Sequence, residues 1–302
     1  MNRRDFLKWS SATLAVAAVG PATLLAAEAP GKKRDLKKGY MLGTFPIKEL
    51  PLIEKFKMLK AAGFDGVEPP SHLPQDEVLR ARDETGLIIP SVSNGQHSRA
   101  LSHADPGERA EAVEGVKQGL RDAKRYGATS ILVVPGSVNE QVSYADAYTR
   151  TQAELRKAVP LAEELGVKIA LENVWDHFLL SPMEAARFVD EFNSPAVGWH
   201  FDIGNVIFMA WPEQWIRILG KRIQKLHIKE YSRKKMNEKG LRAGFAVEYL
   251  EGDDDWPAVM KALDDIDYRG WGIAEPAWRP EGVEPAARLK QIAEKMDKIF
   301  AM

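Results

Sequence analysis

Short apolar runs alternate with amphipathic stretches along the chain after residue 38. The short runs have the composition of buried β-strands, and they lie at residues 40–44, 66–68, 88–92, 130–134, 168–173, 197–203, 223–229 and 270–275. The stretches between them carry apolar residues at three- and four-residue spacing, which predicts helices with one buried face, for example over residues 52–62, 110–126, 149–165 and 256–263. Glycines stand where several of these helices should end, because glycine adopts the left-handed conformation of a helix cap.

This alternation predicts eight βα units in a single domain over residues 39–302. Strands that are apolar along their whole length are buried on both faces, as in a parallel sheet covered by helices. We therefore expect a closed (β/α)8 TIM barrel of the α/β class. A doubly wound open sheet is the alternative architecture.

Four of the predicted strands end in a side chain that binds metals. Glu172, Asp202, His227 and Glu275 follow one another at the ends of the last four strands. In a parallel barrel the carboxyl ends of all strands meet at one rim. Side chains alternate along a strand, and pointing outward would bury these charges under helices without partners. We expect all four to point inward and to converge at the rim.

Three carboxylates and one imidazole form a mostly oxygen-rich set of donors. Such a set suits one divalent ion of Mn²⁺, Mg²⁺ or Co²⁺, and it suits Zn²⁺ less well without thiolates or further histidines. An ion that chelates a hydroxyl and a neighbouring carbonyl acidifies the C–H between them and stabilises the resulting enediolate. Glu172 and Glu275 are then candidates for the base and the acid. The sequence thus predicts isomerisation or epimerisation beside a carbonyl.

Other polar and aromatic residues near the strand ends are candidates for substrate binding. They are Glu68, His72, His97, Trp175, His200, Asn205 and Lys229. Glu68 and His72 could instead support other side chains or lie in a solvated loop, and His200 is expected mainly to orient Asp202. The basic segment 232–242 follows the seventh predicted strand, and we expect it to act as a lid over the site.

The first 29 residues form a different kind of sequence. Arg3 and Arg4 precede an apolar, alanine-rich run and a cluster of small residues, which is typical of a twin-arginine export signal. The alternatives are an uncleaved anchor and a chance arginine pair. Residues 30–38 would form a linker. We therefore expect the export machinery of this pathway as a partner, a periplasmic location and no permanent membrane span.

Composition narrows the remaining classes of function. The 42 Lys and Arg residues balance 43 Asp and Glu residues, so no nucleic-acid surface is indicated. Cysteine is absent, which excludes disulfides, thiolate ligands and a cysteine nucleophile. Association into a homo-oligomer stays open.

Several segments resemble the sugar isomerase/epimerase family with the xylose-isomerase-like barrel, which includes ketose 3-epimerases, hydroxypyruvate isomerase and relatives of inosose dehydratase. They are GFDGVE at 63–68, ALEN at 170–173, FDIGN at 201–205, KLHIKE at 225–230, EGDDDW at 251–256 and GWGIAEP at 270–276. The resemblance implies a TIM barrel, the same four ligands, and Glu172 and Glu275 as the acid/base pair. Two positions depart from the family's epimerases: Asn205 replaces a histidine, and Phe178 replaces an acidic residue.

These departures keep other functions open beside a sugar, keto-sugar or cyclitol isomerase. The same metal site could serve a dehydratase, or a lyase acting on 3-keto-glycosides. A carbohydrate-binding barrel without turnover is a further alternative. The abasic-site endonucleases of the same fold need more histidines than the six in this chain, so a DNA-repair role is not expected.

Overall fold

The computed structural model describes residues 34–277 and 280–302. In this part of the chain, parallel strands pair in the order β1-β7-β6-β5-β4-β3-β2. Their bounds are Leu36–Tyr40 for β1, Ser91–Ser93 for β2, Ser130–Val133 for β3, Lys168–Glu172 for β4, Val197–Asp202 for β5, Ile223–Ile228 for β6 and Gly270–Ala274 for β7.

The predicted strand at 66–68 closes this sheet into a barrel. It forms only isolated bridges to its neighbours and no continuous strand. Its backbone forms parallel bridges from Glu68 to Met41 after β1, and from Gly66 to Ile88 before β2. Pro69 and Pro70 follow directly and lack an N–H, yet the pairing continues to β2 through a bridge from Pro70 to Ser93. Gly66 is needed here, because a Cβ would lie 2.5 Å from the Ile88 carbonyl oxygen. The closed sheet confirms the barrel and excludes the open-sheet alternative.

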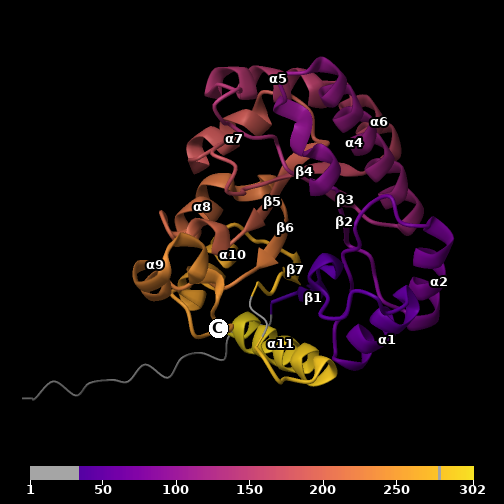
Figure 1. Cartoon of the computed structure of the whole chain (residues 1–302), viewed down its shortest axis with the longest axis vertical. Helices are drawn as coiled ribbons and strands as arrows, with labels where there is room; N and C mark the ends of the chain where they lie inside the picture. Colours follow the sequence, from indigo (N-terminus) through magenta and orange to yellow (C-terminus); the bar gives the residue numbers. More distant parts are fainter. Residues whose placement is uncertain (1–33, 278–279) are drawn as a thin grey trace, which may run out of the picture. The chain divides into compact units, whose positions relative to one another are not determined.

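Helices surround the strands and cover their outer face (Figure 1). They are α1 (Leu52–Ala61), α2 (Gln75–Thr85), α3 (Gly95–Ser98), α4 (Pro106–Tyr126), α5 (Tyr144–Arg156), α6 (Val159–Leu165), α7 (Pro182–Asp190), α8 (Pro212–Leu219), α9 (Arg233–Lys239), α10 (Trp256–Asp265) and α11 (Pro285–Phe300). Short 3₁₀ helices are η1 (Leu42–Thr44), η2 (Arg99–Ser102), η3 (Gly204–Val206), η4 (Gly220–Arg222) and η5 (Leu241–Phe245). Among the described residues, no helix has the length and apolar character needed to cross a membrane.

The bounds of several predicted elements differ from those observed, and two of these differences have a clear physical cause. The first strand, β1, ends at Tyr40 instead of beginning there, so part of the predicted linker 30–38 belongs to the sheet. The lysines of β1 are tolerated in a strand because Lys38 pairs with Asp297 on α11, and Lys37 lies over the Trp271 ring. The single helix predicted over 149–165 is two helices, since the ring of Pro160 prevents a continuous backbone hydrogen-bond ladder.

Candidate metal centre

Neighbouring strands bring the four predicted ligands to one rim of the barrel. Glu172 and Asp202 are the last residues of β4 and β5, and His227 lies one residue before the end of β6. Asp202 pairs in register with His227. Glu275 follows β7 directly, and its backbone N–H donates to the carbonyl of Ile228. The parallel register therefore fixes the heights of all four side chains together.

The donor atoms of these four residues converge. One donor atom from each lies within 4.8 Å of the other three. Nδ1 of His227 is 2.9 Å from Oε1 of Glu172 and 2.9 Å from Oε2 of Glu275. Asp202 and His227 are fully buried, and the side chain of Glu275 is 18% exposed. This spacing suits a single cation held by all four groups.

Lys229 neutralises part of the negative charge of this cluster. Its Nζ lies 2.7 Å from Oδ2 of Asp202, 2.9 Å from Oε2 of Glu275 and 3.2 Å from Oδ1 of Asn205. Three carboxylates and one ammonium leave two negative charges, which one divalent cation would balance. The donor set and its charge thus fit the predicted ion.

Burial and mutual attraction shift the pKa values of the cluster in opposite directions. Burial raises the pKa of Asp202 to about 7 and also raises that of Glu172. Burial alone would raise the pKa of Glu275, but Lys229 and His227 hold it well below its usual value. Burial disfavours a charged imidazole at His227, yet the carboxylates around the ring raise its pKa well above its usual value. His227 therefore provides the balancing positive charge when no cation is bound.

Asn173 holds Asp202 in place through its amide. Its Oδ1 accepts hydrogen bonds from the backbone N–H of Asp202 at 3.0 Å and from Nε1 of Trp199 at 3.1 Å. Its Nδ2 donates to the Asp202 carbonyl at 2.7 Å. The side chain of Asn205 is fixed in turn, because its Nδ2 donates to the Asn173 carbonyl. The backbone N–H of Asn205 donates to Oδ1 of Asp202 at 2.9 Å.

A cavity of about 460 Å³ opens above the cluster. Glu172, Glu275, Asn205 and Lys229 form one side of it, while Asp202 and His227 lie behind the lining. The rest of the lining includes polar groups from the segment after Pro70, the end of β2, α3 and the start of η2, namely Ser71, Ser93, Gln96, His97 and Arg99. A small polar molecule in this cavity would face the carboxylates on one side and neutral or cationic donors on the other.

Three of the predicted substrate-binding residues line this cavity: His97, Asn205 and Lys229. His72 stacks on His97 with ring centroids 3.7 Å apart, but it lies outside the lining. Trp175 supports the site from behind, since its Nε1 donates to the Asn205 carbonyl at 2.8 Å. Its indole packs against other rings near the predicted lid, those of Phe208, Tyr231 and Phe245.

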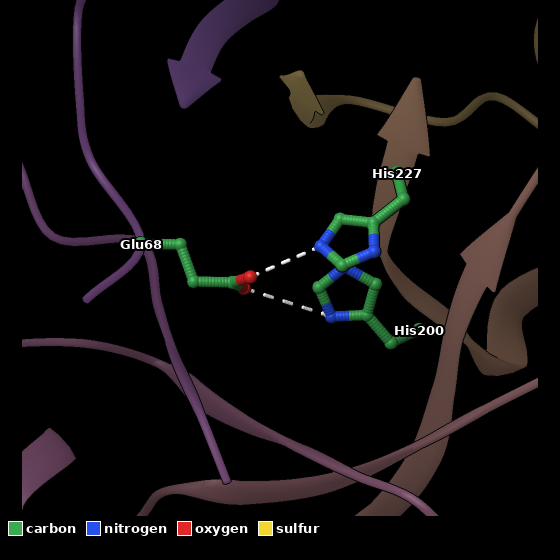
Figure 2. Close-up of side chains that lie close together, drawn as sticks. All are labelled: Glu68, His200 and His227. Carbon is green, nitrogen blue, oxygen red and sulfur yellow. Dashed lines mark hydrogen bonds and ion pairs between the residues drawn. The ribbon is translucent and has the colours of Figure 1, made fainter. Parts of the chain in front are cut away.

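Glu68 and His200 lie deeper in the barrel, beside the far edge of the His227 ring. Oε1 of Glu68 is 3.0 Å from Nε2 of His227, and Oε2 of Glu68 is 3.9 Å from Nδ1 of His200 (Figure 2). The rings of His200 and His227 meet edge to face at 4.2 Å. Both Glu68 and His200 are fully buried and neither lines the cavity. Burial holds the pKa of His200 well below its usual value, so this ring is neutral.

Glu68, His200 and His227 are also close enough to hold an ion. The two clusters share His227 but approach different nitrogens of its ring. A neutral imidazole has one lone pair and one N–H, so it can serve one cation and donate one hydrogen bond. The cluster with three carboxylates is the better cation site, because it supplies the larger negative charge.

Sequence reasoning missed two parts of this site. It assigned no role to Asn173, although the ALEN segment placed an amide beside a ligand. It also missed the far wall of the cavity, where Arg99 forms an ion pair with Asp176 across the rim. The polar residues 93–99 after the predicted third strand could have suggested a role for Gln96 and Arg99. Nothing in this segment, however, indicated which of its side chains face inward.

The sequence pattern of the family described as xylose isomerase-like TIM barrel matches residues 56–299. The chain belongs to this family. A 2-epi-5-epi-valiolone 7-phosphate 2-epimerase from Actinoplanes sp. is 34% identical over 139 residues, 46% of this chain and 48% of the relative. An inosose dehydratase from Clostridium perfringens is 27% identical over 149 residues, 45% of this chain and 50% of the relative. The chain thus spans about half the length of these curated relatives.

Solved structures of the same barrel type extend the likeness to most of the chain. A 3-keto-D-glucoside 4-epimerase from E. coli has a TM-score of 0.74 at 19% identity, covering 88% of this chain and 100% of the other. A D-psicose 3-epimerase from Clostridium cellulolyticum H10, solved with D-tagatose, has a TM-score of 0.73 at 18% identity, covering 88% and 99%. At these identities the likeness establishes the fold.

The N-terminal segment matches a second pattern. Residues 1–20 match the signal sequence of the twin-arginine translocation pathway. This confirms the predicted kind of signal and indicates export. The predicted end of the signal at residue 29 lies outside the described residues, and it stays a prediction.

Proposed function

We propose that this protein is a divalent-metal-dependent isomerase or epimerase of a sugar, keto-sugar or cyclitol. The observation that carries the proposal is the convergence of Glu172, Asp202, His227 and Glu275 at one side of a polar cavity. Curated relatives that include an epimerase and a dehydratase support the same class of substrate. The preferred ion is Mn²⁺, Mg²⁺ or Co²⁺, because most of the donors are carboxylate oxygens.

A divalent ion held by Glu172, Asp202, His227 and Glu275 would supply Lewis-acid polarisation of a substrate hydroxyl and carbonyl, which would acidify the C–H between them. Glu172 and Glu275 are the proposed proton carriers, since both line the cavity and come from different strands. One carboxylate would remove the proton, and the other would return a proton at the position that defines the product. Asp202 and His227 lie behind the cavity wall and serve only to hold the ion.

Lys229 and Asn205 are the proposed contacts for substrate oxygens on the same wall. Lys229 already lies within 3.2 Å of the Asn205 side chain and lines the cavity. An ammonium beside the reacting carbons stabilises negative charge that develops on an oxygen during proton transfer. His97, on the opposite wall, is the proposed contact for the far hydroxyls of the substrate.

Exchange with deuterated water tests the proton carriers. Purified protein with Mn²⁺ should interconvert two isomers from a panel of keto-sugars and cyclitols and incorporate one deuterium at the reacting carbon. Glu172→Gln and Glu275→Gln should each abolish interconversion, and each should keep exchange with one isomer only. Bound metal is measured in the same samples, so that loss of the ion is separated from loss of a base.

Glu248→Gln is the matched control, because Glu248 is also buried but pairs with Arg288 away from the cavity. It should interconvert the isomers as the wild type does. Near-native interconversion by Glu172→Gln or Glu275→Gln with metal bound would refute the two-base mechanism.

A dehydratase or lyase is the second candidate, favoured by the position of Asn205. Asn205 lines the cavity but cannot carry charge or change its protonation state, unlike the histidine of the family's epimerases. A residue that cannot exchange a proton at this position favours a reaction other than the epimerisation of the family's members, and elimination from the same anion is the candidate. Mass spectrometry separates the outcomes, because an isomerase keeps the substrate mass apart from deuterium, whereas a lyase releases water or an aglycone.

We also propose that the protein acts in the periplasm after export. The supporting observation is the twin-arginine signal at residues 1–20. Replacing Arg3 and Arg4 with lysine should leave the protein in the cytoplasm, as measured by cell fractionation. Replacing Lys32 and Lys33 with arginine should leave export unchanged. Equal periplasmic amounts after the first replacement would refute the proposal.

A further inference from the structure

Glu68 is the buried carboxylate closest to the metal cluster that has no role in the proposed chemistry. It lies in the 66–70 segment, and its backbone is fixed on the β1 side: its N–H donates to Tyr40, and its carbonyl accepts from Leu42. The side chain is fully buried and is absent from the cavity wall. Direct contact with a substrate in the cavity is therefore not available to it.

The Glu68 carboxylate meets the edge of His227 that faces away from the metal cluster. Figure 2 shows the Glu68 oxygens directed toward the rings of His227 and His200. Oε1 lies 3.0 Å from Nε2 of His227, which is hydrogen-bonding distance, whereas Oε2 is 3.9 Å from the nearest His200 nitrogen and accepts no hydrogen bond among the described residues. His227 is thus the main partner of Glu68.

We propose that Glu68 is a positioning residue that selects the ring orientation and tautomer with which His227 binds the ion. A carboxylate at Nε2 requires a proton there, which leaves the lone pair on Nδ1. Nδ1 is the nitrogen that lies 2.9 Å from both Glu172 and Glu275. A carboxylate behind a ligand histidine also increases the basicity of the ring and so strengthens its bond to a cation. This inference rests on the proposed metal site.

Lys225 is a buried cation that interacts electrostatically with Glu68 inside the barrel. Lys225 lies two residues before His227 on the same inward face of β6, and it is 5% exposed. Its Nζ donates to the Thr129 hydroxyl at 2.8 Å. Burial lowers the pKa of Lys225 to about 8, and the electrostatic attraction of Glu68 partly offsets this decrease. The Glu68 carboxylate thus has a buried cation as an electrostatic partner in addition to His227.

The inference is tested by Mn²⁺ binding to Glu68→Gln, measured by calorimetry on metal-free protein. Glutamine has nearly the same shape but carries no charge, so we expect binding about 10- to 100-fold weaker than in the wild type. Glu248→Gln removes a buried carboxylate elsewhere and should bind Mn²⁺ as the wild type does. Each folded protein should bind one ion. Equal affinity of Glu68→Gln and wild type, or a second ion of similar affinity in the wild type, would overturn the inference.

A second measurement tests the inference in the wild type as well as in the variants. In protein with ¹⁵N-labelled histidine and bound Zn²⁺, which is diamagnetic, NMR should show a far-downfield, slowly exchanging proton on Nε2 of His227. It should move upfield in Glu68→Gln and stay in place in Glu248→Gln. A proton on Nδ1, or a rapidly exchanging Nε2 proton in the wild type, would contradict the role of Glu68 even if the variant does not fold. Failure of the wild type to bind Mn²⁺ or Zn²⁺ would instead refute the proposed metal site.

Discussion

At the scale of single residues, the site depends on side chains that hold the ligands as much as on the ligands themselves. Asn173 makes three hydrogen bonds that fix the end of β5, two of them to the backbone of Asp202. All of these groups are buried, so a lost partner would leave polar atoms without water or protein to bind.

Asn173→Ala should therefore lower the free energy of unfolding by roughly 2–4 kcal/mol, because it leaves the Asp202 N–H and the Trp199 indole N–H unpaired in the interior. It should also weaken Mn²⁺ binding, since Asp202 is no longer held in place. Urea unfolding of metal-free protein and calorimetry measure the two effects. Asn237→Ala, at an exposed position of α9, should change stability by less than about 0.5 kcal/mol. An unchanged Mn²⁺ affinity in Asn173→Ala would contradict this account.

At the scale of elements, a pair of carboxyl groups, the buried Glu230 and the half-buried Asp254, joins the segment after β6 to the segment before α10. Oε2 of Glu230 accepts from the Leu250 N–H and from the Trp256 indole, and Oδ2 of Asp254 accepts from the Tyr231 N–H. The other oxygen of each group has no further hydrogen-bond partner among the described residues. Burial and the neighbouring carboxylate raise the pKa of Asp254 well above its usual value, so the two groups share a proton.

This pair should make stability fall as the pH rises. The folded protein keeps a proton on Asp254 that the unfolded chain releases, so its stabilising effect is complete below the usual aspartate pKa, about 4, and is lost as the pH rises through the raised value. In Asp254→Asn the amide replaces the protonated acid, and this part of the pH dependence should disappear. Urea unfolding in EDTA between pH 5 and 9 measures it. Asp253→Asn, at the exposed neighbour, should keep the wild-type slope; an unchanged slope in Asp254→Asn would count against the shared proton.

At the scale of the whole barrel, ion binding joins the last four strands and should stabilise the folded state. A ligand at 100 times its dissociation constant adds about 2.7 kcal/mol, which corresponds to a rise in Tm of roughly 5–10 °C for a domain of this size. Calorimetry with Mn²⁺ and with EDTA checks this. His227→Ala should abolish the rise, whereas His103→Ala, outside the cluster, should keep it. A wild-type Tm that is the same in Mn²⁺ and EDTA would contradict the metal site.

The barrel and its candidate ligands were predictable from the sequence because both follow from local order. A short apolar strand before each helix predicts a parallel sheet, and a ligand at the end of each strand predicts a shared rim. The bounds of β1 were wrong by four residues, because Lys37 and Lys38 read as linker until their contacts with Trp271 and α11 are known. The break between α5 and α6 could have been read from Pro160.

The sequence by itself determined the architecture, the export signal and the four residues that meet at the rim. Only the tertiary structure decided which nitrogen of His227 faces those carboxylates, and that Glu68 lies behind the ring instead of in the cavity. The spacing of apolar residues along the chain predicts where the strands lie and in which order they follow one another. The direction of a side chain depends on partners far away in sequence, here 159 residues apart, which no local pattern encodes.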